Sequence, residues 1–122
     1  FDKILKYRDI FDLEMCQTVS ALNVYNLNNF RKFTKDHGLI IAYNYVQYPD
    51  HLHVSLIPEE MKTEIVNNLD ELVSYEADKL KLELFKETRQ RDIDRFYSFI
   101  SIMDKQRNVK IGDYLPEWNE YF

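Results

Sequence analysis

Apolar and polar residues follow two different periods in the first part of the chain, and each period predicts one kind of element. Phe1, Ile4, Leu5 and Phe11 fall near helical spacing, so the chain is expected to open with the end of an amphipathic helix. From Leu13 to Ala21 apolar and polar residues alternate instead. This alternation predicts a strand.

A helix and a second strand are expected next. Asn26 can cap the helix through its side chain, and Gly38 is expected to end it. The apolar face of this helix is formed by Leu27, Phe30 and Phe33. Leu39 to Val46 is a nearly continuous apolar run, which is typical of a parallel strand covered on both faces. Strand, helix and strand together predict a βαβ unit with two parallel strands.

The second half of the chain has helical patterns. A helix is expected to begin at Pro58, and its apolar spacing continues toward Phe85, so that one long helix can cover this range. A further helix presents one apolar stripe, made of Ile93, Phe96, Tyr97, Ile100 and Met103. The aromatic tail is expected to pack back onto these helices and to bury Trp118 and Phe122 at least in part.

These elements predict an α/β chain made of a βαβ unit and several helices. With 122 residues the chain is a single domain or a fragment, with the opening helix and the βαβ unit in residues 1–57 and the helical part with the aromatic tail in residues 58–122. Two strands are fewer than the roughly 4 to 6 of a typical sheet, so an incomplete barrel or sheet is expected. The first residue is Phe1 rather than methionine, which indicates a processed product or an excerpt.

Charge and cysteine content narrow the classes of function. Lys and Arg total 16 against 21 for Asp and Glu, and the net charge of −5 argues against a nucleic-acid-binding protein. The longest apolar run, Leu39 to Tyr43, is far shorter than the ~18 residues that a membrane span requires. Cys16 is the only cysteine, which excludes an internal disulfide and favours a reducing, cytoplasmic location. On a buried strand it would be an inert thiol.

Polar residues follow both predicted strands. The first set is Thr18, Ser20 and Asn23, and the second is Asn44, Gln47 and Tyr48. Open α/β sheets and α/β barrels bind ligands at the carboxyl ends of their strands, so both sets are expected at one rim. Their hydroxyls and amides could bond a carboxylate, a ribose or an adenine edge. The alternative is that Ser20 and Asn23 make only local bonds in a strand-to-helix turn.

No catalytic or metal-binding residue is predicted. His51 and His53 form a pair without a third close ligand, so solvated loop histidines are expected rather than a zinc site. Arg89, Arg91 and Arg95 form a basic spot that could bind a phosphate or an acidic partner. An ordinary salt-bridged helix start is the expected interpretation of this spot.

Three segments in succession resemble the C-terminal part of radical S-adenosylmethionine proteins, in the group related to the twitch and SPASM subfamilies. They are TVSALNVYNLNNFRKFTKDHGL (residues 18–39), NYVQYPDHLHVSLIPEEMKTEI (residues 44–65) and FYSFISIMDKQRNVKIGDYLPEW (residues 96–118). That group has a strand ending in a TVS-type motif, an asparagine and a helix, and then a strand, two helices and a D…R…PE tail. The resemblance implies that the two strands are late strands, the fifth and sixth, of a partial (β/α) barrel.

The cofactors that this resemblance implies belong to the parent protein. In the family a 4Fe–4S cluster cleaves S-adenosylmethionine, and the CxxxCxxC motif that holds the cluster is absent from this chain. The expected partner is therefore the N-terminal part of the parent chain, and this chain alone is expected to be inactive. By resemblance, Thr18, Ser20 and Asn23 face the cofactor, and Asn44 and Tyr48 face the substrate.

The expected function is thus the C-terminal barrel portion of a radical S-adenosylmethionine enzyme, which shapes the cofactor and substrate pocket without being catalytic by itself. The alternative from another class is a non-catalytic α/β module that binds a protein partner through an exposed sheet edge or through its tail. Unpaired strand edges recruit other chains, so the isolated chain is also expected to form a homo-oligomer through such an edge or to cover it with its own helices.

Overall fold

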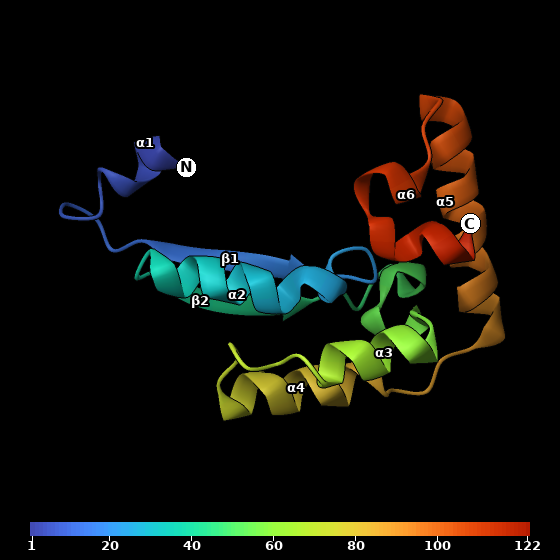
Figure 1. Ribbon diagram of the computed structural model, residues 1–122, viewed down its shortest axis with the longest axis horizontal. Helices are drawn as coiled ribbons and strands as arrows, with labels where there is room; N and C mark the ends of the chain where they lie inside the picture. Colours follow the sequence, from blue (N-terminus) through green and yellow to red (C-terminus); the bar gives the residue numbers. More distant parts are fainter.

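The computed structural model describes residues 1–122, and its first half contains the expected βαβ unit (Figure 1). Strand β1 (Glu14–Val19) is followed by a 3₁₀ turn, η1 (Val24–Asn26), and by helix α2 (Leu27–Asp36). Strand β2 (Ile40–Tyr45) then pairs with β1 in parallel, with each residue of Glu14–Val19 opposite its counterpart in Ile40–Tyr45. The predicted parallel pair with a helix between its strands is confirmed.

Local sequence explains where α2 ends better than where it begins. Gly38 follows the helix with φ of 63°, and its N–H bonds the carbonyl of Lys35 at 2.9 Å. Glycine adopts this left-handed conformation without the clash that a Cβ atom causes, so the prediction that Gly38 ends the helix is confirmed. Asn26 does precede the helix, but its side chain makes no capping hydrogen bond, because η1 already leads the backbone into α2.

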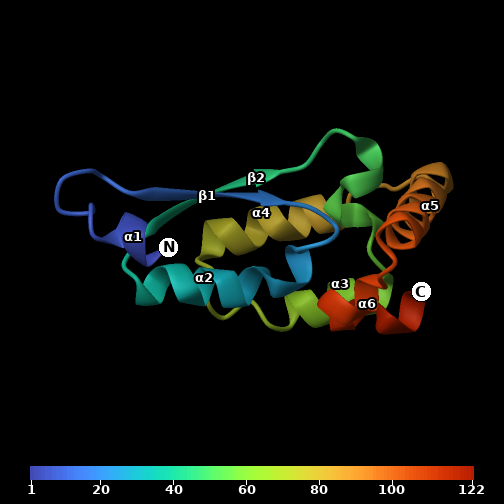
Figure 2. The ribbon, with the colours of Figure 1, turned by 90° about the horizontal axis from the view of Figure 1, so that it is seen from above.

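Only one face of the two-stranded sheet is covered by helices. Figure 2 shows α2 and α4 (Ser74–Leu84) on the same side of the sheet and no element on the other. The residue pattern agrees, because Val19 and Tyr45 are buried toward the helices while Thr18 and Asn44 are exposed. The expectation that β2 is covered on both faces is therefore wrong. On the uncovered face of β2, Ile40 keeps 69% of its surface exposed to solvent.

The second half is helical, but the expected long helix from Pro58 toward Phe85 is two helices. Helix α3 (Glu59–Val66) ends at Val66, and α4 begins only at Ser74. Asn67, Asn68 and Asp70 in the connection are residues that favour turns, because their short polar side chains compete for backbone hydrogen bonds. The apolar spacing continues through the connection since Leu69 and Leu72 still pack on the core.

The remaining elements complete the order along the chain. Two 3₁₀ turns, η2 (Asp50–Leu52) and η3 (Val54–Leu56), lie between β2 and α3. Helix α5 (Gln90–Arg107) follows α4, and the tail forms α6 (Ile111–Tyr114) and η4 (Pro116–Tyr121). None of the helices combines the length and the apolar composition that a membrane crossing requires.

The opening segment differs from its prediction. Helix α1 (Asp2–Leu5) has only four residues, and turns follow it up to β1. Its apolar side chains find little cover, since Ile10 and Phe11 keep 73% and 62% of their surface exposed. The ring centre of Phe1 lies 4.9 Å from that of Phe33 on α2, but Phe1 also keeps 43% of its surface exposed. The helical spacing here thus does not correspond to a buried helix face.

The core joins the two halves of the chain and includes the tail. It is a cluster of 17 buried side chains drawn from the βαβ unit, the helices and the tail. Trp118 of η4 is fully buried, with its ring centre 5.1 Å from that of Phe96 on α5. Phe122 contacts the same aromatic group but keeps 45% of its surface exposed. The prediction that the tail packs back is confirmed.

Candidate functional site

The carboxyl ends of the two strands present polar side chains on the open face of the sheet. Thr18 and Asn44 lie opposite each other in the register, and both are exposed. Glu14 and Cys16 follow on the same face of β1. The prediction that Cys16 is a buried thiol is wrong, because the face of β1 to which it belongs has no covering helix. We call Glu14, Cys16, Thr18, Ile40, Ala42 and Asn44 the open face.

Ser20 and Asn23 form a closed turn between β1 and η1. The Asn23 side chain accepts a hydrogen bond from the Ser20 backbone N–H at 2.9 Å and donates one to the carbonyl of Thr18 at 2.8 Å. The Ser20 hydroxyl accepts one from the backbone N–H of Leu22 at 3.3 Å. The local-turn alternative for these two residues therefore describes their bonds in this structure. The Asn23 amide and the Ser20 hydroxyl oxygen thus make local bonds, and of the first predicted set Thr18 alone presents its side chain on the open face.

The residues after β2 diverge. Tyr48 keeps 88% of its surface exposed and contacts no partner through a hydrogen bond. Gln47 is exposed, and its Nε2 donates to Oε2 of Glu83 on α4 at 3.1 Å. The second predicted set is therefore not brought together, because Asn44 lies on the open face, Gln47 reaches α4 and Tyr48 points into solvent.

A buried polar network links the loop after β2 to α4. His53 Nε2 lies 2.9 Å from Oε2 of Glu83, and His53 Nδ1 lies 2.8 Å from the hydroxyl of Ser55. The backbone N–H of Ser55 also donates to His53 Nδ1 at 3.1 Å. Nδ1 thus acts as an acceptor, which leaves the ring proton on Nε2, where it is donated to Glu83. All three residues are buried. The expectation that both loop histidines are solvated is wrong for His53.

Two lysines complete the surroundings of Glu83. Lys79 and Lys86 place their Nζ atoms 2.9 Å and 3.0 Å from Oε1 of Glu83. Burial raises the pKa of Glu83, but hydrogen bonds from Lys79, Gln47, His53 and Lys86 outweigh it and lower this pKa to about 2. Glu83 is therefore a carboxylate at neutral pH. The sequence offered no signal for this network, since 30 residues separate Glu83 from His53.

The network resembles a serine, histidine and carboxylate chain in its contacts, but its geometry favours a structural role. The Nδ1 atom that would take a proton from the Ser55 hydroxyl already accepts the Ser55 backbone N–H. Glu83 is held by two lysines, which stabilise a fixed anion rather than a group that assists proton transfer. The network thus ties the loop after β2 to α4.

A second buried ion pair lies under the covered face of the sheet. Arg31 of α2 and Glu76 of α4 are joined at 3.2 Å, and Glu76 also accepts the backbone N–H of Val73 at 3.1 Å. Tyr43 and Tyr45 of β2 lie on this face. Burial, followed by the nearby Glu83 carboxylate, raises the pKa of Tyr45 to about 12, and burial raises that of Tyr43 strongly. Both phenols stay protonated at any physiological pH.

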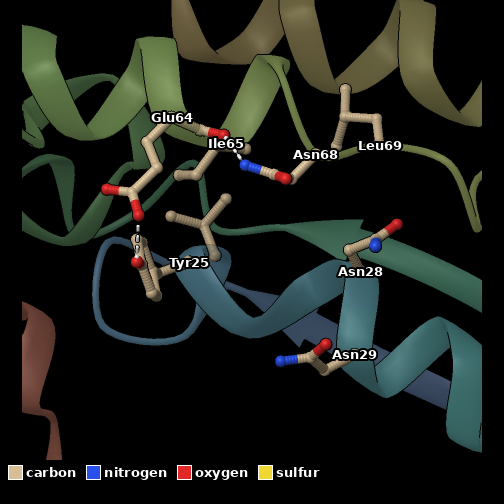
Figure 3. Close-up of a pocket in the computed structure, with 8 residues that line it drawn as sticks. Tyr25, Asn28, Asn29, Glu64, Ile65, Asn68 and Leu69 are labelled. Carbon is tan, nitrogen blue, oxygen red and sulfur yellow. Dashed lines mark hydrogen bonds between the residues drawn. The ribbon is translucent and has the colours of Figure 1, made fainter.

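A pocket of about 310 Å³ lies between the start of α2 and the end of α3 (Figure 3). The Tyr25 hydroxyl donates to the carboxylate of Glu64 across it, and Asn68 Nδ2 donates to the Glu64 carbonyl at 2.8 Å. Asn28 donates to Asp70 at 2.8 Å and accepts from the backbone of Glu71. Most polar groups of this pocket therefore join η1 to α3 and α2 to the connection between α3 and α4, and few are left for a ligand.

No group of three or more His, Cys, Asp or Glu side chains is arranged so that it could hold a metal ion. Cys16 is the only thiol, whereas an iron–sulfur cluster is held by several thiolates. The residues of this chain alone therefore do not fit the cluster that the family resemblance implies for a parent protein.

Comparison with known proteins assigns no relative. No protein-family model matches the chain, and no curated protein and no solved structure is significantly similar to it.

Proposed function

We propose that this chain is the C-terminal portion of a partial (β/α) barrel in a radical S-adenosylmethionine enzyme. In this role it shapes the pocket for cofactor and substrate without being catalytic by itself. The observation that carries the proposal is the one-sided sheet: α2 and α4 cover one face of β1 and β2, and the other face is open and polar at its carboxyl end (Figure 2).

A one-sided parallel sheet suits a barrel better than an open α/β sheet. Doubly wound sheets carry helices on both faces, whereas barrel strands carry helices only outside and turn their other face to the interior. In a barrel the open face of this chain would line that interior. Thr18 and Asn44 would then lie near the rim at which such barrels bind ligands, with one hydroxyl and one amide able to bond a ribose or a carboxylate.

The rest of the site would come from a partner. The cluster cleaves S-adenosylmethionine reductively, and its thiolates would belong to the N-terminal part of the parent chain. This chain would contribute wall residues that orient the cofactor and exclude water. A reducing cytoplasm is the location that we propose, because it would preserve both the cluster and the exposed thiol of Cys16.

The test uses the whole gene product. We expect a CxxxCxxC motif in the ~100 to 200 residues encoded before Phe1, which is about one domain. The whole product, purified without oxygen and supplied with iron and sulfide, should show the visible absorbance of a cluster and form 5′-deoxyadenosine. A product without the motif and without cluster absorbance would contradict the proposal.

Variants of the open face make the test specific to this chain. The double variant Thr18→Ala and Asn44→Ala should weaken binding of S-adenosylmethionine to the whole product about 10-fold, since two hydrogen bonds contribute ~0.5 to 1.5 kcal/mol each. Asn29→Ala is the matched control, because Asn29 is an exposed amide of α2 on the other side of the sheet. Equal affinities for all three proteins would exclude the open face from the binding site.

Exposed apolar side chains favour a second candidate, a non-catalytic module that binds a protein partner. Ile10, Phe11 and Ile40 each keep more than half of their surface exposed, and β1 and β2 each have an unpaired edge. Such an edge can add a strand from another chain. In this case the whole product would lack a cluster, and light scattering would show an oligomer that Ile40→Lys dissociates.

A further inference from the structure

A second pocket, of about 500 Å³, lies between the start of α3, the end of α4, α5 and the tail. Its size is within the range of small-molecule sites in proteins, ~300 to 1,000 Å³. Ile57, Phe85 and Ile93 provide apolar walls, and Lys62 and Lys86 are the cations that line it. The pocket therefore combines apolar surface with positive charge in a chain whose net charge is −5.

Lys62 is the unusual residue of this pocket. Its side chain is only 6% exposed, although lysine side chains are almost never buried unless they are paired with an acceptor. Its Nζ contacts Glu59 Oε1 at 2.9 Å and lies 5.8 Å above the centre of the Phe85 ring. An ammonium group has three donors, and the hydrogen bond to Glu59 uses one of them. Two donors of a buried cation thus remain for another acceptor.

The partner of Lys62 is easily displaced. The Glu59 side chain is 76% exposed, so its carboxylate can rotate into water without losing much solvation. The pair is exposed only at its Glu59 end, and solvent screens the charge of that carboxylate. An acceptor held by the apolar walls could therefore replace Glu59 at Lys62.

The rim of the pocket adds positive charge. Lys86 is 44% exposed, and it shares the single carboxylate of Glu83 with Lys79. The charged residues that line the pocket are Lys62, Lys86 and Glu59, so the lining carries a net charge of about +1, which attracts anions. The hydroxyl of Thr88, another lining residue, is bonded to the carbonyl of Ser55 at 3.0 Å.

We infer that this pocket binds a small organic monoanion with an apolar body, such as an aryl or branched-chain carboxylate. The carboxylate takes the free donors of Lys62, and the body packs against Ile57, Phe85 and Ile93. The walls favour this class over inorganic phosphate, since apolar surface does not compensate the desolvation of a multiply charged ion. The inference does not depend on the proposed barrel function, because none of these residues lies on the open face.

The test measures ligand binding to the complete chain by calorimetry, with 3-phenylpropionate as the probe. For ~11 non-hydrogen atoms we expect a Kd on the order of 0.1 to 1 mM. The neutral analogue 3-phenylpropionamide should bind at least 10-fold more weakly, because it cannot form the charge-assisted bond to Lys62. Absence of any heat at about 10 mM ligand, or equal affinity for acid and amide, would overturn the inference.

Two variants should change the affinity in opposite directions. Lys62→Met should weaken binding of 3-phenylpropionate about 10-fold or more. Glu59→Gln should strengthen it, because the competing carboxylate is removed while the fold keeps its core. Lys32→Met is the matched control, since Lys32 is an exposed lysine paired with Asp36 on α2. If Lys62→Met does not fold, the Glu59 variant and the neutral analogue still decide the result, and weaker binding by Glu59→Gln counts against the site.

Discussion

Four side chains surround the carboxylate of Glu83, and they come from three parts of the chain. Gln47 and His53 belong to the segment after β2, Lys79 to α4, and Lys86 follows α4. A charge that is 99% removed from solvent is tolerated only when its acceptor sites are filled in this way. Among single residues, Glu83 is therefore the group whose contacts hold the loop after β2 on α4.

Glu83→Gln should lower the free energy of unfolding by roughly 2 to 3 kcal/mol at pH 7, because donors at Lys79 and His53 lose a charged acceptor. Urea unfolding followed by far-UV circular dichroism measures this loss. Asp36→Asn is the control, since its ion pair with Lys32 lies at the surface and should contribute less than about 1 kcal/mol.

Glu83 should also make the stability of the fold depend on pH. Folding lowers the pKa of Glu83 from 4.5 to about 2, so its contribution is fully present above pH 4.5 and is lost as the pH falls toward 2. The difference in stability between the wild-type chain and Glu83→Gln should therefore shrink over this window. A difference that stays constant between pH 5 and about pH 2 would show that the charge of Glu83 does not stabilise the fold.

At the scale of elements, two helix ends require a left-handed residue. Gly38 after α2 has φ of 63°, and Asn108 after α5 has φ of 54°. A Cβ atom on Gly38 would also come within 3.3 Å of Nη2 of Arg8, which donates to the carbonyl of His37. Glycine suits such positions and asparagine is tolerated at them.

Gly38→Ala should destabilise the chain by about 1 kcal/mol, and Asn108→Gly should leave it unchanged or stabilise it by up to about 1 kcal/mol. The shift in the urea midpoint at constant slope measures both effects. The two variants control for each other because both positions have the left-handed conformation, and one substitution adds a Cβ atom there while the other removes one. Destabilisation of similar size in both would contradict the argument from backbone conformation.

At the scale of the whole molecule, the tail covers the core with the buried side chain of Trp118. The ring of Trp118 packs 5.1 Å from that of Phe96 and 5.8 Å from that of Tyr121, and no part of it reaches solvent. Its Nε1 has no hydrogen-bond partner within the chain. The stabilisation by Trp118 therefore comes from packing and not from its polar atom.

Trp118→Ala should cost about 3 to 5 kcal/mol, which is a large part of the stability of a domain of this size. Trp118→Phe should cost much less, because it keeps most of the packing and removes a buried donor without a partner. Phe122→Ala is the control, since Phe122 is 45% exposed. Thermal unfolding followed by circular dichroism ranks the three variants. Equal losses of stability for Trp118→Ala and Phe122→Ala would mean that burial of Trp118 does not hold the tail on the core.

The features that depend on neighbouring residues could be predicted from the sequence. The alternation before Ala21, the apolar run from Leu39 and the glycine at 38 were sufficient to predict a parallel βαβ unit, because strand and helix periods and left-handed caps are local properties. The apolar and aromatic residues of the tail were also sufficient to predict that Trp118 is buried, since water disfavours so much exposed aromatic surface.

Which of these residues come into contact depends on how distant parts of the chain pack together. The packing of the helices left one face of the sheet uncovered, so that Cys16 is exposed, and α3 ends at Val66 although the apolar spacing continues. The packing also brought His53 to Glu83 and buried Lys62. Such contacts join residues far apart in the chain or depend on which helix covers which face. A hydropathy pattern reports that a residue prefers burial or water, but it does not name the partner.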